Sequence, residues 1–268
     1  KGLNMNIFVL GGGTNLLISD DGYDGLVIQP AFSDISVDKN YISVGSGVHM
    51  SNLIGTAISR GLAGLEWAGG LPGTVGGAVY GNAGCFGGEI KDSLYEVDTL
   101  DMDTLEINTR SNEDCRFSYR TSAFKSGELQ EIILGAKFRL DPGDKRYLSR
   151  MVDEKIAYRN NRHPLEYPNI GSIFKNIPVT DKNRKVVEAY KCEVKTDPFP
   201  VVPAAHLISR AKLMGRNVGG AVVSEKHPNF IVNVMDARAH DVLELIQIVK
   251  AEVLDKFEIE LEEEVRVI

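Results

Sequence analysis

The stretch VLGGGTNLLISD, Val9–Asp20, decides the fold of this chain, because an apolar run meets three consecutive glycines there. The run from Ile7 to Leu10 predicts a strand buried on both faces. Three glycines in a row exceed what a tight turn needs, so they indicate close approach of another group to the backbone. A Rossmann loop is disfavoured, because Leu16 stands at the third glycine position and a second apolar run follows instead of a helix.

A second glycine-rich stretch, AGGLPGTVGGAVYGNAGCFGGEI at Ala68–Ile90, holds nine glycines in twenty-three residues. Interleaved apolar residues distinguish it from a flexible linker. Pro72-Gly73-Thr74 predicts a turn entering a short helix, with small residues that let a ligand touch the backbone. We favour a ligand-wrapping loop here; close helix packing is the alternative.

The other elements follow from periodicity and turn residues. Ser51 is expected to cap a helix that ends at Gly61, and the region 92–140 reads mostly as strands. Asp141-Pro142-Gly143 is the expected domain boundary. Further helices are predicted at 148–161, 204–211 and 241–257, the last with one apolar stripe of Val242, Ile246, Val249, Val253 and Phe257.

The last segment, EIELEEEVRVI at 258–268, alternates as a strand does. This pattern places Ile259, Leu261, Val265 and Val267 on one face. It places Glu264 on the opposite, acidic face, where a solvated side chain would be expected without further information.

Composition narrows the class of protein. The net charge of −7 over 268 residues argues against a nucleic-acid binder. No window approaches a membrane span. Three cysteines without metal spacing indicate reduced thiols of a cytoplasmic protein. The histidines show no metal-ligand spacing, which disfavours a metal site. No G-x-S-x-G motif occurs, which disfavours a serine hydrolase. The chain starts at Lys1 with a strand almost at once, so we expect that an element ahead of that strand is missing.

Six stretches resemble one family. They are LGGGTNLLISD, GLEWAGGLPGTVGGAVYGNAGCFGGEI, FSYRTSAF, HPLEYPNIGSIFKN, GRNVGGAVVSEKHPNFIVN and LEEEVRVI, in that order and over nearly the whole chain. The chain resembles the UDP-N-acetylenolpyruvoylglucosamine reductases, flavoenzymes of bacterial peptidoglycan precursor synthesis. The resemblance implies an α+β chain: an FAD-binding fold of the vanillyl-alcohol-oxidase type plus an α+β substrate-binding domain. We expect the FAD-binding region at 1–142, the substrate-binding domain at 143–257, and at 258–268 a strand that carries Glu264 to the active site.

The resemblance also implies the reaction and its residues. NADPH reduces the FAD, and the flavin N5 then gives hydride to the enolpyruvyl group of a UDP sugar, which forms UDP-N-acetylmuramate. The catalytic residues of the family fall on Arg120, Ser172 as proton donor, and Glu264. The expected FAD-binding positions are Leu10, Gly11, Gly12, Gly13, Thr14, Asn15, Leu16, Pro72, Gly73, Thr74, Gly76, Gly77, Asn82 and Gly84.

Elementary chemistry agrees with these roles. Hydride addition β to a carboxylate builds an enolate, which a cation such as Arg120 would stabilise. The α carbon then needs a proton, which Ser172 can give if its alkoxide is supported, with Lys175 and Arg120 as candidates. An extended segment from Gly171 to Asn176 would point Ser172, Phe174 and Asn176 the same way. The expected substrate-binding residues are Asn176, Lys175, Arg159, Arg162, Lys226 and His227.

Two departures and two alternatives stay open. The block that the family has ahead of the first glycine loop is largely absent, and the short distance from Arg120 to Ser172 places the chain in the branch without the extra tyrosine loop. One alternative is another flavin oxidoreductase of this fold that acts on a different sugar or alcohol. The other is a nucleotide-binding or regulatory module without turnover.

Overall fold

The computed structural model describes residues 5–196 and 199–268, and the chain divides into two compact units. The first unit runs up to Gly13 and resumes over Asp24–Arg159. The second contains Thr14–Tyr23 and Asn160–Ile268. The division falls near the end of helix α4 (Lys145–Arg162) instead of after Pro142, because Leu148 and Val152 near the start of α4 are buried in the first unit.

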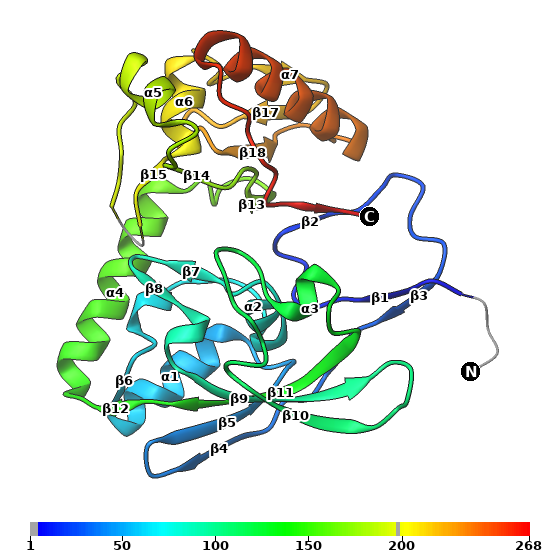
Figure 1. The fold of residues 1–268 in the computed structure, drawn as a ribbon, viewed down its shortest axis with the longest axis vertical. Coiled ribbons are helices and arrows are strands. Elements are labelled where there is room, and N and C mark those ends of the chain that lie inside the picture. The colour runs from blue at the N-terminus through cyan, green and yellow to red at the C-terminus, as the bar shows by residue number, and fades with distance from the viewer. Residues whose placement is uncertain (1–4, 197–198) are drawn as a thin grey trace. The chain divides into compact units, whose positions relative to one another are not determined.

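A five-stranded antiparallel sheet, in the order β10-β9-β11-β5-β4, forms the centre of the first unit (Figure 1). Its strands are β4 (Ile35–Asp38), β5 (Tyr41–Gly45), β9 (Leu94–Asp101), β10 (Ile107–Ser111) and β11 (Glu131–Arg139). In β11 a register shift between Ile133 and Gly135 interrupts the in–out alternation of side chains, so both Ile132 and Ile133 are buried. Around the sheet lie α1 (Met50–Arg60), α2 (Val75–Tyr80), α3 (Ala123–Ser126), the short helices η1 (Glu66–Ala68) and η2 (Ile90–Asp92), and the pairs β7 (Gly84–Cys85) with β8 (Gly88–Glu89) and β6 (Leu62–Ala63) with β12 (Asp141–Pro142).

The first strand lies where it was predicted, but the prediction that both of its faces are buried was wrong. β1 (Ile7–Val9) pairs in parallel with β3 (Leu26–Ile28), and these two strands form a sheet of their own. Ile7 is 45% exposed because a two-stranded sheet covers its strands poorly.

The predicted caps of α1 are correct at its C-terminal end and wrong at its N-terminal end. Gly61 ends α1 in the left-handed conformation, as predicted. The cap at Ser51 was wrong: α1 begins at Met50, whose N–H donates to the Gly73 oxygen at 3.0 Å, and His49 is the N-cap without a side-chain bond. Thr74 caps α2 through its hydroxyl, which accepts from the Gly77 N–H at 3.5 Å, and the predicted turn into a short helix is confirmed.

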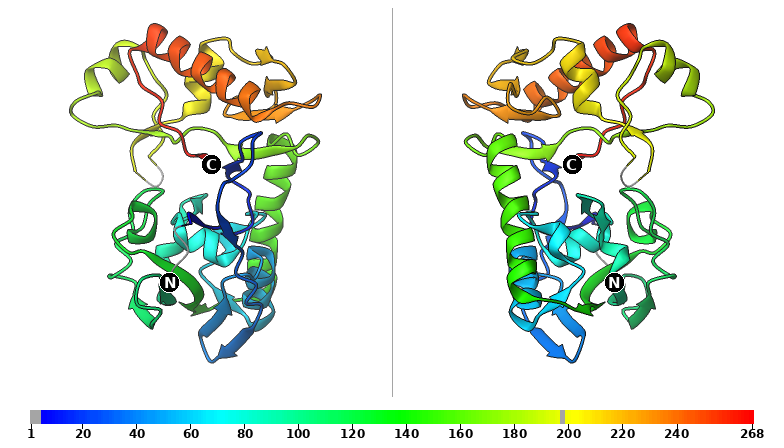
Figure 2. Two further views of the ribbon diagram at one scale, coloured as in Figure 1. Left: turned by 90° about the vertical axis from the view of Figure 1, so that its right-hand side faces the viewer. Right: turned by 90° about the vertical axis from the view of Figure 1, so that its left-hand side faces the viewer.

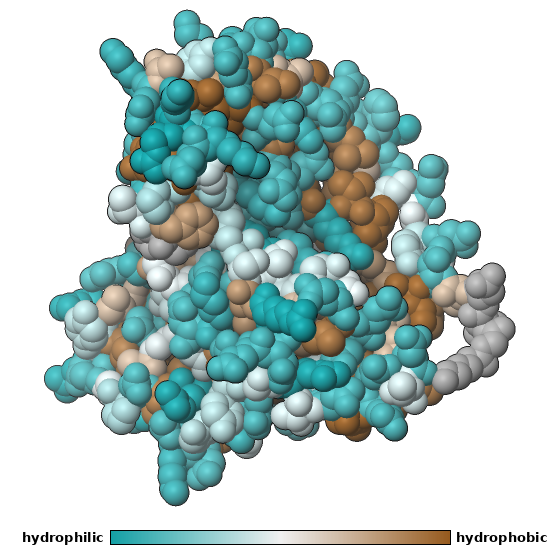
Figure 3. Space-filling model, in the orientation of Figure 1, coloured by the Kyte–Doolittle hydropathy of each residue, from teal (hydrophilic) through white to brown (hydrophobic). Residues whose placement is uncertain are grey.

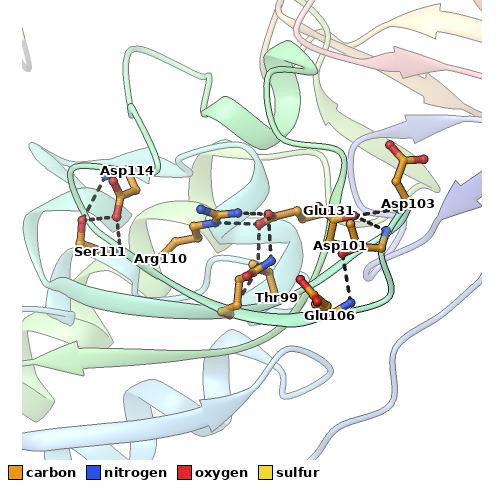
Figure 4. A network of polar contacts seen from close by, with 10 residues as sticks. Thr99, Asp101, Asp103, Glu106, Arg110, Ser111, Asp114 and Glu131 are labelled. Carbon is orange, nitrogen blue, oxygen red and sulfur yellow. Dashed lines mark hydrogen bonds and ion pairs between the residues drawn. The ribbon is translucent and has the colours of Figure 1, made fainter.

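A buried carboxylate holds the β9–β10–β11 part of the sheet together. Figure 4 shows Arg110 and Thr99 directed at Glu131, whose side chain is 2% exposed. The Arg110 Nε donates to it at 3.2 Å and the Thr99 hydroxyl at 2.7 Å. The bond from Arg110 lowers the pKa of the Glu131 carboxyl, because it stabilises the charged form.

The second unit packs helices on a four-stranded antiparallel sheet, in the order β13-β18-β17-β16. Its strands are β13 (Asn169–Ser172), β16 (Asn217–Val218), β17 (Ala221–Val223) and β18 (Phe230–Asn233). Figure 2 shows α7 (Ala239–Phe257) lying beside these strands, with α6 (Ala204–Arg210) next to it. Both predicted helices are confirmed, and four of the five predicted stripe residues of α7 are buried, Val242 only partly. The unit also contains α5 (Arg184–Ala189), β14 (Ile177–Pro178) paired with β15 (Val201–Val202), and β2 (Leu16–Leu17) paired with β19 (Arg266–Val267).

The C-terminal segment is less regular than predicted. Only Arg266–Val267 forms a strand. Ile259, Leu261 and Val265 are buried as the alternation requires, but Val267, predicted on the same face, is 39% exposed. These three buried side chains belong to the same apolar cluster as Val249, Val253 and Phe257 of α7. The parity prediction for Gly171–Asn176 was wrong, because the chain bends at Ile173, so that Ile173 and Phe174 are both buried.

The face drawn in Figure 3 is mostly hydrophilic, with separate groups of apolar residues. Within the described part of the chain, no helix combines the length and apolarity that crossing a bilayer requires.

Candidate active site

The two glycine-rich loops lie against each other in the first unit. A Cβ added at Gly12 would lie 2.8 Å from the Gly73 Cα, and one at Gly11 would lie 3.1 Å from the Thr74 hydroxyl. Contacts this short exclude a side chain at Gly12 unless backbone moves. The first loop therefore needs glycine partly because the second loop is packed on it.

Other glycines of the second loop face the protein. A Cβ added at Gly76 would lie 2.9 Å from Ser46, and a Cβ added at Gly69 would lie 2.8 Å from the Val152 oxygen. A Cβ added at Gly88 would collide with the ring of Trp67. The alternative of close packing thus accounts for part of the glycine content of this loop.

The remaining glycines form an exposed backbone surface. Gly13 has φ of 67° and meets only a Leu10 methyl at 3.9 Å, while Gly77 meets only the Thr74 hydroxyl at 3.6 Å. Gly13, Pro72 and Gly77 are exposed. Side chains at such positions would fill the space that an extended cofactor needs, so the residues present fit a dinucleotide laid along the two loops.

Arg120 lies in a tight turn of the first unit. Ser118 and Thr121 exchange backbone bonds of 3.0 and 3.1 Å, and Arg120 between them has φ of 56°, a left-handed value that is rare for this residue type. The Lys125 ammonium donates to the Arg120 oxygen at 2.9 Å. The turn is thereby held in a strained conformation, which is common at functional sites.

Asn82 is fully buried beneath this turn. Its amide donates to the Ser118 oxygen at 3.0 Å and to Glu89 at 3.3 Å, and its side-chain oxygen accepts from the Lys91 N–H at 3.2 Å. Because its side chain is engaged with protein groups, any cofactor contact of Asn82 would have to come from its backbone. Gly84 follows on β7, between Glu89 and the Arg120 guanidinium.

The second unit brings the two distant motifs around Ser172 and Glu264 together. The Glu264 N–H donates to the oxygen of Ile173, the residue after Ser172, at 2.8 Å. Phe174 and Glu263 form a β-bridge, and the Lys175 N–H donates to the Glu262 oxygen at 2.9 Å. Glu264 is half-buried by this pairing, so the solvated face predicted by periodicity was wrong.

Asn15, at the end of the first glycine-rich loop, is hydrogen-bonded to the segment around Glu264. The Asn15 amide donates to the Glu264 main-chain oxygen at 3.2 Å, and the Arg266 N–H donates to the Asn15 oxygen at 3.2 Å. Thr14 lies near Gly171, and Leu16 continues into β2 beside β19. The Asn15 side-chain oxygen is buried with no hydrogen-bond partner among the described residues, so it can accept from a bound group.

Asn229 was missed by sequence reasoning. Its buried side chain accepts from the Phe174 N–H at 3.0 Å and donates to the Phe174 oxygen at 2.8 Å. It thereby fixes the backbone two residues beyond Ser172. The signal lay in the quoted stretch KHPNF, where only the charged residues were considered.

The predicted substrate-binding side chains have other contacts within their own units. The Lys175 ammonium forms an ion pair with Glu262, and the Asn176 side-chain oxygen accepts from the Ala204 N–H at 3.2 Å. In the first unit, Arg159 donates to the Gly69 oxygen at 2.9 Å and to the Cys85 sulfur at 3.0 Å. Their roles toward a substrate stay predictions.

The rest of the predicted basic set belongs to the second unit. Arg162 is exposed, and the Lys226 ammonium donates to Asn160 and Glu166 at 3.1 and 3.2 Å. Burial lowers the pKa of His227, which packs against His163 and Phe230. His227 is therefore neutral at pH 7 and can offer a hydrogen bond but little charge to a diphosphate.

Comparison with known proteins agrees with this arrangement. A family model described as an FAD binding domain matches residues 2–109, and one described as the C-terminal domain of UDP-N-acetylenolpyruvoylglucosamine reductase matches residues 163–268. The fold and the loops define a two-domain protein of the FAD-binding class, and the predicted α+β fold class is confirmed.

Relatives along the whole chain are more specific. The reductase of Latilactobacillus sakei is 39% identical over 98% of this chain and 78% of its own length, and that of Heliobacterium modesticaldum is 40% identical over 97% and 76%. The crystal structure of the Thermus caldophilus reductase has a TM-score of 0.74 and 30% identity, and the match covers 98% of this chain and 86% of that one. The chain belongs to the UDP-N-acetylenolpyruvoylglucosamine reductase family.

Proposed function

We propose that this chain reduces the enolpyruvyl group of UDP-N-acetylglucosamine enolpyruvate to give UDP-N-acetylmuramate, with NADPH and FAD, in peptidoglycan precursor synthesis. Family membership over nearly the whole chain is the observation that carries the proposal. FAD, when bound, supplies the chemistry that accepts two electrons from NADPH and passes them to the substrate. The exposed backbone of Gly12, Gly13 and Gly77 would hold it.

The protein groups then manage charge and a proton. The Arg120 guanidinium would bind the substrate carboxylate and stabilise the negative charge that develops as its neighbouring double bond is reduced. The Ser172 hydroxyl would give the proton to the carbon α to that carboxylate. Glu264 would orient or polarise the same carboxyl region.

The pairing of Glu264 with the residue after Ser172 supports a shared role. Their motifs lie far apart in sequence, yet the 2.8 Å bond from the Glu264 N–H to the Ile173 oxygen fixes the spacing of the two backbones. Positioning of this kind lowers the cost of orienting an acid at a reacting carbon.

The partners and the location follow from this reaction. The substrate is a UDP sugar with an enolpyruvyl ether, and we place the reaction in the cytoplasm, where NADPH and nucleotide sugars occur. Lys226, His227, Arg159 and Arg162 are proposed to contribute to binding of the diphosphate, and Lys175 and Asn176 to binding near the reacting end.

An anaerobic spectrum of the purified protein tests the proposal. Flavin bands should bleach when NADPH is added and return when the enolpyruvyl UDP sugar is added. Reduction of the oxidised flavin by a different sugar or alcohol, with no reoxidation of the reduced flavin by the enolpyruvyl sugar, would instead indicate another flavin oxidoreductase of this fold. Binding of the UDP sugar without flavin, even after addition of FAD, would instead indicate a binding module.

A further inference from the structure

Glu89 is a buried carboxylate to which the proposed reaction assigns no role. Its side chain is 7% exposed and forms an ion pair of 2.7 Å with Lys91, while Asn82 donates to the same oxygen. The other oxygen, Oε1, is buried and has no hydrogen-bond partner among the described residues. The Glu89 side chain also accepts from the Asp92 N–H as the N-cap of η2. A buried carboxylate costs free energy unless it is paired and hydrogen-bonded, so the groups around Glu89 show what it holds in place.

The β7–β8 hairpin places this carboxylate beside Arg120. A Cβ added at Gly84 would lie 2.7 Å from the Glu89 Cγ and 3.2 Å from the Arg120 Nη1. Both charged side chains therefore border the same point, where only glycine leaves them room. Opposite charges at this spacing in a partly buried place attract each other.

Asn82 links the same carboxylate to the backbone of the Arg120 turn. One amide group donates both to Glu89 and to the Ser118 oxygen, at the start of the turn. On the other side of the turn, the Ser122 hydroxyl donates to the Tyr80 oxygen at 2.6 Å. The second glycine-rich loop thus holds the turn at its backbone and faces the guanidinium.

We propose that Glu89 and Asn82 are positioning residues that orient the Arg120 guanidinium toward the carboxylate of the substrate. This inference rests on the proposed function. It assigns the β7–β8 hairpin a role apart from the predicted contact of Gly84 with FAD: the hairpin sets the direction of the guanidinium. Glu89 acts through its charge and Asn82 through the backbone of the turn.

Glu89→Gln tests the proposal, because it keeps the shape and an acceptor for Asn82 but removes the charge. Flavin content and the rate of flavin reduction by NADPH should stay unchanged. Reoxidation by the enolpyruvyl sugar should slow by about tenfold to a hundredfold, the range that misplacement of a catalytic group produces. Calorimetry on the oxidised protein should show weaker binding of the enolpyruvyl sugar, but unchanged binding of UDP-N-acetylglucosamine, which lacks the carboxylate.

Two controls separate positioning from loss of stability. Glu131→Gln neutralises a carboxylate in a separate buried network and should lower the melting temperature without changing the ratio of the two affinities. In an Arg120→Ala background, Glu89→Gln should have no further effect on reoxidation, because its action requires the guanidinium.

Asn82→Asp tests the backbone link, since aspartate tolerates the left-handed φ of 44° but has no amide to donate. It should weaken binding of the enolpyruvyl sugar more than binding of UDP-N-acetylglucosamine. Equal weakening for both sugars, or a full further loss in the Arg120→Ala background, would overturn the proposal. A parent protein that is not reoxidised by the enolpyruvyl sugar would overturn the proposed function instead.

Discussion

Gly12→Ala separates the two reasons for glycine in the first loop. The new Cβ would lie 2.8 Å from the Gly73 Cα and 3.3 Å from the Thr74 nitrogen. Since unbonded carbons rest about 3.5–4.0 Å apart, the two loops must separate by about 1 Å. Overpacking of this kind costs about 1–3 kcal/mol.

The cost should appear in the apoprotein as well as in cofactor binding. The melting temperature of the apoprotein should fall by about 2–4 °C for each kcal/mol. The free protein can relieve the strain by separating its two loops. FAD binding must then bring the loops together again, at the same cost in free energy, and the affinity for FAD falls by roughly 5- to 150-fold. Thermal unfolding and a titration of apoprotein with FAD, followed by flavin fluorescence, measure the two effects.

Gly77→Ala is the matched control. Its Cβ would meet only the Thr74 hydroxyl at 3.6 Å, so it adds no strain, and alanine in a helix gains about 0.5–1 kcal/mol over glycine. The apoprotein should therefore be at least as stable as the parent, while FAD affinity falls because the methyl group occupies the exposed face. If Gly12→Ala changes neither the melting temperature nor the affinity for FAD, the packing of the two loops on each other is refuted.

Three further predictions concern the proposed chemistry and the sheet. Ser172→Ala should leave flavin reduction by NADPH intact and slow reoxidation by the substrate by at least about a hundredfold, the usual scale of acid catalysis; equal loss in both half-reactions, followed by stopped flow, would contradict a proton donor. Glu264→Gln should also slow only reoxidation, and near-normal turnover would show that the side chain takes no part. Because Arg110 lowers the pKa of Glu131, this pair stabilises the fold above the ordinary glutamate pKa of 4.5, and that contribution is lost as the pH falls through the lowered value. Glu131→Gln should therefore be less stable than the parent at pH 7, with a difference that shrinks in acid denaturation curves below pH 4.5; a pH-independent difference would refute the linkage.

Periodicity succeeded where the structure is set by nearby residues. The stripe of α7, the stop of α1 at Gly61 and the turn capped by Thr74 depend on residues within a few positions of each other. Such signals are local, so one sequence contains them in full.

Glu264 and Asn82 show where the sequence was insufficient. Alternation placed Glu264 on a solvated face, but a hydrogen bond to Ile173, about ninety residues earlier, half-buries it. Asn82 stands in a motif that indicates cofactor binding, yet its side chain bonds to Ser118 and Glu89. Partners this far apart along the chain leave no periodic signal.

Residue types and their order were enough to predict the fold class, the two glycine-rich loops and, through the motifs, the family. The folded chain was needed to distinguish glycines that face protein from glycines that face open space, and to find what holds the Arg120 turn. A missing side chain has the same appearance in a sequence whether a ligand or another backbone lies beside it. Only the positions of the neighbouring atoms distinguish Gly12 from Gly77.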